Sequence, residues 1–209
     1  MSNSILNLEA LRAAPLVREP FDYLILPGFI DPAACAAINA DYPSIAQHGS
    51  FPIEHVPCGP AFNEMADELR GPEFREICEQ KFGIDLDDRP TVITARGQCC
   101  AKDGRIHTDT PSKIITALIY MNPAWESPGG RLRLLRSRDN LDDYIAEVPP
   151  HEGTLLMFRR SNNSWHGHKQ FVGARRVIQF NWVTDDARAR WHVWKHRVSA
   201  TVKKLVPFA

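Results

Sequence analysis

A histidine and a carboxylate stand two residues apart in the segment His107-Thr-Asp109. Alternate side chains of an extended strand leave the same face, so both could bind one metal ion. A distant histidine would complete the site, and His166-Gly-His168 offers one 57 residues after Asp109. Two histidines and a carboxylate leave three adjacent positions open on an octahedral iron(II), as a bidentate ligand plus dioxygen requires. A lone His-x-Asp pair is common by chance, so the neighbouring motifs decide its meaning.

Four further motifs follow the pair in a fixed order. They are Gly129-Gly130-Arg-Leu, Pro150-x-x-Gly153, His166 and the basic pair Arg175-Arg176. The series resembles the iron(II)/2-oxoglutarate-dependent dioxygenases, in particular their prolyl-4-hydroxylase-like branch, over about residues 91–183. The resemblance implies a mainly β fold with flanking helices, built on a double-stranded β-helix (a cupin-like jelly roll). It also implies iron(II) as the metal and 2-oxoglutarate as the co-substrate.

The resemblance assigns a role to each matched residue. His107 and Asp109 match the proximal metal-binding pair of the family and His166 its distal histidine, so these three are the expected metal ligands and catalytic residues. Arg176 lies ten residues after His166 and matches the basic residue that binds the C5 carboxylate of 2-oxoglutarate. Tyr120 matches a position where related enzymes place a tyrosine hydroxyl on that same carboxylate.

Each assignment has an alternative. Arg175 competes with Arg176, and because neighbouring strand residues point to opposite faces only one can face the barrel interior; the spacing favours Arg176. His168 shares a face with His166 and could replace it as a ligand, although the family spacing favours His166. Tyr120 could equally be a core aromatic that needs a single hydrogen-bond partner.

The implied activity is hydroxylation of an unactivated C–H bond, with release of succinate and carbon dioxide and with ascorbate as an external reductant. Asp109 separates the sequence from the halogenating members, which have a small residue at that position. Two other functions stay open. One is a cupin-like metal enzyme that uses His107, His166 and His168 without 2-oxoglutarate, and the other is a non-catalytic ligand-binding β-barrel module.

The substrate is expected to be a small molecule or a peptide, because specificity in this fold lies in loops around the barrel mouth. We expect four such loops, at residues 43–63, 99–106, 138–147 and 159–164. Four basic residues fall near this mouth and suggest an anionic group on the substrate, with a solvated basic rim as the alternative: Lys102, Arg105, Arg159 and Arg160.

Composition excludes several other classes. The 209 residues, 44% of them hydrophobic, suit one domain with a single core. Basic and acidic residues both number 25, so no charge excess points to nucleic acid or to a membrane. The five cysteines, including the adjacent Cys99 and Cys100, do not suit the disulfide framework of a small secreted protein. We therefore expect a cytoplasmic protein; its oligomeric state is not predicted.

The elements that must position the site fall into three regions of the single domain 1–209. Residues 1–90 are expected to form a strand at 21–30, a helix at 32–40 capped by Asp31, and one or two helices at 62–81. Residues 91–184 should form the β core, and 185–209 a C-terminal helix. The core strands are expected at 91–98, 105–109, 114–121, 131–135, 153–158, 165–171 and 175–183.

The segment 43–63 is rich in proline, glycine and serine and is long for a connection in a small domain. We predict a mobile lid that closes over the barrel mouth when substrate binds. Its apolar underside would be Phe51, Ile53 and Val56. The alternative is a fixed strap, in which these three residues pack permanently against the helix that follows.

Overall fold

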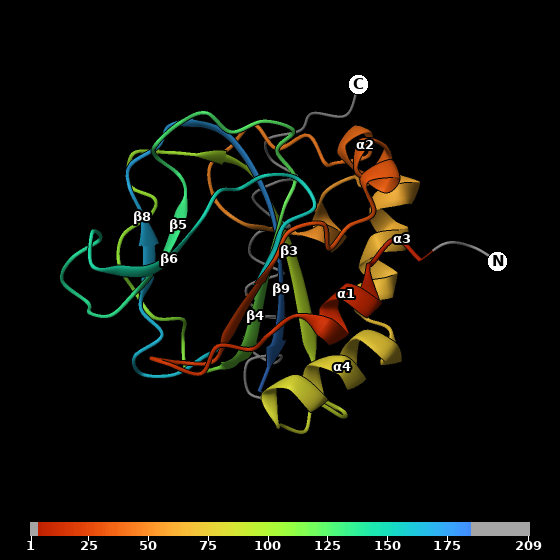
Figure 1. Ribbon diagram of the computed structural model, residues 1–209. Helices are drawn as coiled ribbons and strands as arrows, with labels where there is room; N and C mark the ends of the chain where they lie inside the picture. The colour runs from red at the N-terminus through yellow and green to blue at the C-terminus, as the bar shows by residue number, and fades with distance from the viewer. Residues whose placement is uncertain (1–3, 185–209) are drawn as a thin grey trace.

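The β-branched and apolar runs of the second half of the chain form most of two antiparallel sheets in the computed structural model, which describes residues 4–184 (Figure 1). The larger sheet has six strands, in the order β1 (Tyr23–Leu26), β7 (Leu155–Arg159), β4 (Lys113–Tyr120), β9 (Gly173–Val183), β3 (Thr91–Cys99) and β2 (Phe51–Pro52). The smaller sheet has three, in the order β6 (Tyr144–Val148), β5 (Leu132–Leu135) and β8 (His166–His168). The two sheets face each other as the halves of a double-stranded β-helix.

Helices cover the face of the larger sheet that points away from the smaller one (Figure 1). Within residues 4–184 these are α1 (Leu8–Ala13), α2 (Pro32–Ala40), α3 (Pro60–Leu69) and α4 (Pro72–Phe82). Phe74 of α4 stacks on Trp182 of β9 with 5.5 Å between ring centroids, and meets Phe180 edge-on at 5.7 Å. These aromatic contacts fix the helical layer on the sheet.

Strand β9 separates two apolar cores, because its side chains alternate between the faces of the sheet. Ile178, Phe180 and Trp182 point into the core beneath the helices. Val177 points the other way, into a smaller core between the two sheets. The strand therefore forms the wall between the scaffold and the barrel interior.

Several expected elements are confirmed. Helix α2 begins after Asp31, whose side chain accepts a hydrogen bond from the backbone N–H of Ala33 (2.7 Å). The helical region expected at 62–81 is two helices, α3 and α4. The expected β1, β3, β4, β5, β7 and β9 are present with shifted ends, and β8 is shorter than the predicted 165–171. The helix predicted at 185–209 lies outside the described residues.

Other expectations are wrong. Residues 105–109 do not form a strand, because only His107 makes a β-bridge there, to His166. The predicted mouth loop 138–147 contains most of β6, which pairs with β5. The short helix α1 was not expected from the sequence.

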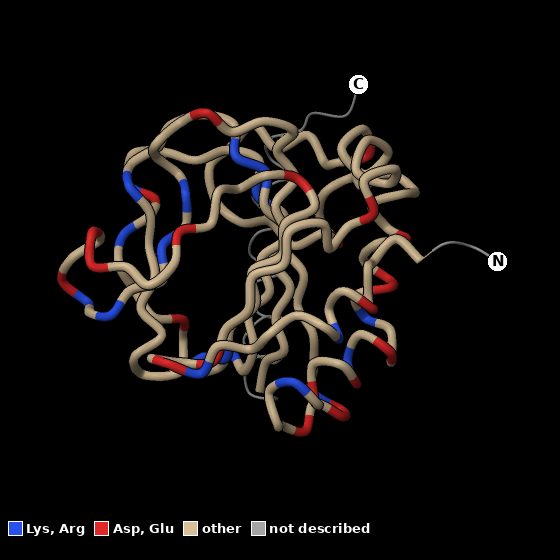
Figure 2. The backbone as a smooth tube through the Cα atoms, viewed as in Figure 1, with Lys and Arg blue, Asp and Glu red and all other residues tan. Residues whose placement is uncertain are grey.

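No helix in the described part of the chain is long and apolar enough to cross a bilayer. Basic and acidic residues are interspersed along α1 and α4 (Figure 2), whereas the charged residues of α3 are all acidic.

The segment 43–63 is held against the sheet. Phe51 and Pro52 form β2 and pair with Ala95 and Thr94 of β3, and a 3-10 turn follows at Ile53–His55. The side chain of Ile53 is buried in the core beneath the helices, and those of Phe51 and Val56 pack against it. These contacts favour the fixed strap over the lid.

Candidate metal centre and active-site cavity

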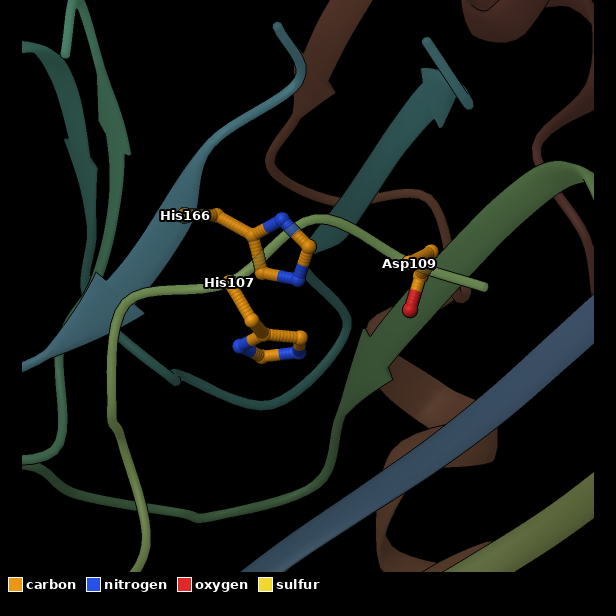
Figure 3. Close-up of side chains that lie close together, drawn as sticks. All are labelled: His107, Asp109 and His166. Carbon is orange, nitrogen blue, oxygen red and sulfur yellow. The ribbon is translucent and has the colours of Figure 1, made fainter. Parts of the chain in front are cut away.

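One ligand atom from each of His107, Asp109 and His166 lies within 4.8 Å of the others. His107 and His166 are joined by two backbone hydrogen bonds, 3.0 and 2.9 Å long, so their rings lie side by side with 4.3 Å between centroids. The Asp109 carboxylate faces the rings from the segment that leads into β4 (Figure 3). Two imidazoles and one carboxylate on one side of a space suit an octahedral iron(II) with three adjacent positions open.

Each imidazole is oriented by the backbone carbonyl of the residue two positions before it. The Nδ1 atom of His107 lies 2.8 Å from the carbonyl oxygen of Arg105, and that of His166 lies 3.0 Å from the carbonyl oxygen of Ser164. A carbonyl can only accept, so each Nδ1 carries the hydrogen and donates it. Each Nε2 then keeps its lone pair for a metal ion, which is the usual way in which a histidine ligand is oriented.

Both carboxylate oxygens of Asp109 have partners. Oδ1 lies 2.8 Å from the Lys113 ammonium, and Oδ2 accepts a hydrogen bond from the Thr116 hydroxyl at 2.5 Å. The Thr116 hydroxyl also lies 3.0 Å from the side-chain oxygen of Asn181. The backbone carbonyl of Asp109 accepts from the Arg160 guanidinium at 3.2 Å. Asp109 is therefore oriented by side chains on β4 and β9 and by the segment that follows β7.

The protonation states of the buried ligands suit a cation. Burial is the main reason that the pKa of His166 falls to about 4, with a smaller contribution from neighbouring His107. Burial alone would raise the pKa of Asp109, but Lys113 and His166 outweigh it and hold that pKa below its usual value. A neutral imidazole and an ionised carboxylate are the forms that bind metals.

The three ligands line a cavity of about 330 Å³ between the sheets. Its basic and acidic lining side chains are Arg96, Lys102, Asp103, Arg105, Asp109, Lys113 and Arg175. The volume lies at the lower end of the range for small-molecule sites, roughly 300–1,000 Å³. A cavity of this size could hold a small dicarboxylate and the reacting part of a second molecule.

The two neighbouring arginines of β9 face opposite ways. Arg175 lines the cavity, its side chain is buried, and its Nε donates to the carbonyl of Gly130 at 2.8 Å. Arg176 lies on the helical side, where its guanidinium donates to the backbone and side-chain oxygens of Asn39, both at 3.1 Å, and lies over the Tyr42 ring. This placement argues against the prediction that Arg176 reaches the co-substrate, and it brings Arg175 to the cavity instead.

Tyr120 lies beside Arg175 in the core between the sheets. Its side chain is fully buried, and its hydroxyl has no hydrogen-bond partner among the described residues. Burial raises its pKa, although the charge of Arg175 opposes the shift. A buried hydroxyl without a partner is costly. A carboxylate bound to Arg175 would offer it an acceptor, so the residues present fit 2-oxoglutarate.

His168 lines the cavity but does not join the metal cluster. Its Nδ1 lies 2.9 Å from the carbonyl oxygen of Lys169, and burial together with Arg175 lowers its pKa to about 4. Its backbone N–H donates to Gly104 at 2.9 Å. Gly104 has a φ of 85°, and a Cβ there would collide with the His168 ring. His168 is therefore a neutral part of the wall.

Lys113, Thr116 and Arg96 were not identified from the sequence, although all three line the cavity. The signal for Thr116 was its place two residues before Leu118 and four before Tyr120, since alternate residues of a strand share a face. Nothing in the sequence signalled Lys113, because its contact with Asp109 depends on how the intervening turn folds. Of the four basic residues expected at the mouth, Lys102 and Arg105 line the cavity, whereas Arg159 and Arg160 do not.

The comparisons with known proteins agree with this geometry. Residues 97–184 match the family model described as the 2OG-Fe(II) oxygenase superfamily. A search of curated proteins found no match. Among solved structures, the chain is similar to a prolyl-4-hydroxylase from Pseudomonas putida, with 15% identity, a TM-score of 0.57, and 85% of this chain and 97% of the other covered.

Two further solved structures are similar. One is the viral collagen prolyl hydroxylase of Paramecium Bursaria Chlorella virus-1, in complex with 2OG (16% identity, TM-score 0.51, covering 78% of this chain and 96% of the other). The other is HygX from Streptomyces hygroscopicus with nickel and 2-oxoglutarate bound (13%, 0.51, 78% and 83%). At these identities the likeness shows the fold. The family match covers residues 97–184 and includes the triad of His107, Asp109 and His166, so this part of the chain has both the sequence pattern and the metal-binding geometry of the 2OG-Fe(II) oxygenase superfamily.

Proposed function

We propose that this oxygenase hydroxylates an unactivated C–H bond of a small molecule or peptide and converts 2-oxoglutarate to succinate and carbon dioxide. One observation carries the proposal. The cavity that holds the metal triad is also lined by a buried arginine, Arg175, whose guanidinium lies 5.4 Å from the ring centre of Tyr120, a buried residue whose hydroxyl has no hydrogen-bond partner within 4–184. A metal site and a carboxylate site in one cavity are what a 2-oxoglutarate oxygenase needs.

In this proposal Arg175 takes the role that the spacing had assigned to Arg176. Arg175 makes no ion pair with any residue of 4–184, and guanidinium binds carboxylate through parallel hydrogen bonds. Tyr120 would donate its hydroxyl hydrogen to the same carboxylate. His107, Asp109 and His166 would hold the iron.

Dioxygen would be the oxidant, reduced with two electrons from 2-oxoglutarate and two from the C–H bond of the substrate. The iron would mediate this chemistry, and the chain's own residues would orient the reactants. Asp109 occupies one metal position, so that position is not free for a halide, and this favours hydroxylation over halogenation. Thr116 and Lys113 hold the Asp109 carboxylate toward the two imidazoles. Leu118, Leu132 and Val177 give the cavity an apolar wall that limits access of water to the reacting carbon.

The two alternatives fit less well. A cupin-like enzyme that binds metal through His107, His166 and His168 would require His168 in the cluster, and its ring lies outside. It would also leave the buried charge of Arg175 without a ligand. A non-catalytic binding module gives no reason for the metal triad and Arg175 to share one cavity.

We propose that the protein is active in a reducing compartment, the cytoplasm. All five cysteines are free thiols, and an enzyme that depends on iron(II) benefits from a reducing environment. Dioxygen and an organic substrate are the partners that the reaction requires.

The test is turnover of the purified chain with iron(II), 2-oxoglutarate and ascorbate, measured as succinate released while candidate substrates are screened. Anaerobic addition of 2-oxoglutarate should produce the metal-to-ligand charge-transfer absorbance of a chelated iron(II). The matched variants are His166→Ala, which should lose both signals, and His168→Ala, which should keep the absorbance. No absorbance and no 2-oxoglutarate-dependent succinate from the wild-type chain would refute the proposal.

A further inference from the structure

The charges of the cavity are not balanced. Among the described residues, five basic side chains line it but only two acidic ones, Asp103 and Asp109. Both acids are already paired, Asp103 with Arg96 at 3.2 Å and Asp109 with Lys113 at 2.8 Å. Within residues 4–184, Lys102, Arg105 and Arg175 form no ion pair. The cavity therefore has a formal excess of three positive charges.

The proposed co-substrate does not remove this excess. 2-Oxoglutarate carries two negative charges and iron(II) two positive charges, so together they add no net charge. Arg175 binds the far carboxylate of 2-oxoglutarate under the proposed function. Lys102 and Arg105 then stay without an anionic partner in the loaded site.

Lys102 and Arg105 are both exposed and stand at the rim, on the connection between β3 and His107. Neither side chain forms a hydrogen bond or ion pair with a described residue. The acid between them, Asp103, points into the wall, where it accepts a hydrogen bond from the backbone of Cys100 at 2.8 Å and pairs with Arg96. The two cations at the rim are thus available to a second ligand.

From this arrangement we infer that the substrate carries an anionic group, a carboxylate or a phosphate, which Lys102 and Arg105 bind at the rim while the reacting carbon lies at the metal. This inference rests on the proposed function and names its substrate class. The cavity of about 330 Å³ must also hold 2-oxoglutarate, so the charged end of the substrate stays at the mouth. Arginine provides a planar donor fork for such a group and lysine a mobile point charge.

The inference is tested by calorimetric binding to the chain loaded with iron(II) and 2-oxoglutarate under anaerobic conditions. One arm compares N-acetyl amino acids with their carboxamides, which differ by one negative charge. The other compares N-acetyl-O-phosphoserinamide with N-acetylserinamide, so that phosphate and carboxylate recognition are distinguished. The variants are Lys102→Gln/Arg105→Gln and, as the matched control, Arg159→Gln, which removes an exposed arginine outside the cavity.

We expect at least one arm to prefer the charged probe in the wild-type chain. The double variant should lose that preference by about fivefold or more, because it removes both cations at the rim. It should bind neutral probes and 2-oxoglutarate as the wild type does. Arg159→Gln should keep the preference, and added salt should weaken it in the wild type more than in the double variant.

Two results overturn the inference. The first is equal binding of charged and neutral probes in both arms, including no binding of either. The second is a double variant that loses 2-oxoglutarate affinity but keeps the preference for charged probes, because the rim would then attract the co-substrate. A missing charge-transfer absorbance in the wild type would refute the proposed function alone, because probe binding can still be measured on the metal-loaded chain.

Discussion

Replacement of Arg175 and Arg176 of β9, one at a time, tests which of the two arginines binds the carboxylate of 2-oxoglutarate. Arg175→Gln removes the buried cation of the cavity, whereas Arg176→Gln removes a neighbouring guanidinium on the opposite face. Glutamine keeps part of the side-chain length and can still donate a hydrogen bond. Arg175→Gln should weaken 2-oxoglutarate binding, and Arg176→Gln should leave it unchanged.

The size of the effect follows from burial. Arg175 is only 5% exposed, so a carboxylate bound to it would be largely removed from water. Loss of one partner from a buried, hydrogen-bonded charge pair costs about 2–5 kcal/mol. The residual hydrogen bond from glutamine places the expected loss near ~2–4 kcal/mol, which is about 30- to 1000-fold in Kd.

Arg176→Gln should show a different defect. Its guanidinium makes two hydrogen bonds to Asn39 at the end of α2, and such bonds contribute about 0.5–1.5 kcal/mol each. The variant should therefore lose ~1–2 kcal/mol of unfolding free energy. The experiment measures both quantities for each variant: Kd by anaerobic titration of the charge-transfer absorbance, and stability by urea unfolding. An Arg175→Gln protein that is folded and binds 2-oxoglutarate within twofold of wild type would refute the reasoning.

Three further predictions concern neighbouring residues. Tyr120→Phe removes a buried hydroxyl that has no partner among the described residues, so urea unfolding should show an equal or higher stability of the ligand-free chain. The absorbance titration should show 2-oxoglutarate binding weakened by ~1.5–3 kcal/mol. Stability and affinity should therefore change in opposite directions. Thr116→Val, which removes the hydrogen bond to Asp109, should lower iron affinity by about 10- to 100-fold in a metal titration, and unchanged affinity would count against it. If the segment 43–63 is a fixed strap, Ile53→Ala should cost ~2–5 kcal/mol of unfolding free energy. Hydrogen exchange in this segment should then be equally slow with and without substrate. Fast exchange that slows when substrate binds would instead support the mobile lid.

The metal site could be predicted because its chemistry limits the choice. Few residue types bind iron(II), and His107, Asp109 and His166 stand in the family order. The local reason given for the pair was nevertheless wrong. His107 is held beside β8 by a single bridge, and Asp109 turns toward it without a strand between them. Backbone contacts with His166 place His107, and side-chain contacts with Lys113 and Thr116 place Asp109, so the two-residue repeat of a strand is not what brings these ligands together.

The elements that were missed are those with weak local signals. Helix α1 has only six residues, too few for a periodic apolar pattern to be recognised. Strand β6 is an edge strand, and of its five residues only Val148 is buried, so its apolar alternation is faint. The segment 43–63 has the glycine and proline content of a mobile loop. Its position is fixed by pairing with β3 and by burial of Ile53, which depend on residues far along the chain.

The choice between Arg175 and Arg176 depended on information that the sequence does contain. Ile178, Phe180 and Trp182 repeat at every second residue, so the face they share must be the one that packs under the helices. Arg176 has the same parity as these residues, and Arg175 has the parity of the polar Gln179. The spacing of the family allows the basic residue to lie nine or ten positions after His166. Because neighbouring strand residues point to opposite faces, these two positions lie on opposite faces of the strand. Periodicity within the strand is therefore the stronger guide to which basic residue faces the metal, and the same argument favours Thr116, Leu118 and Tyr120 as the row of β4 that faces it.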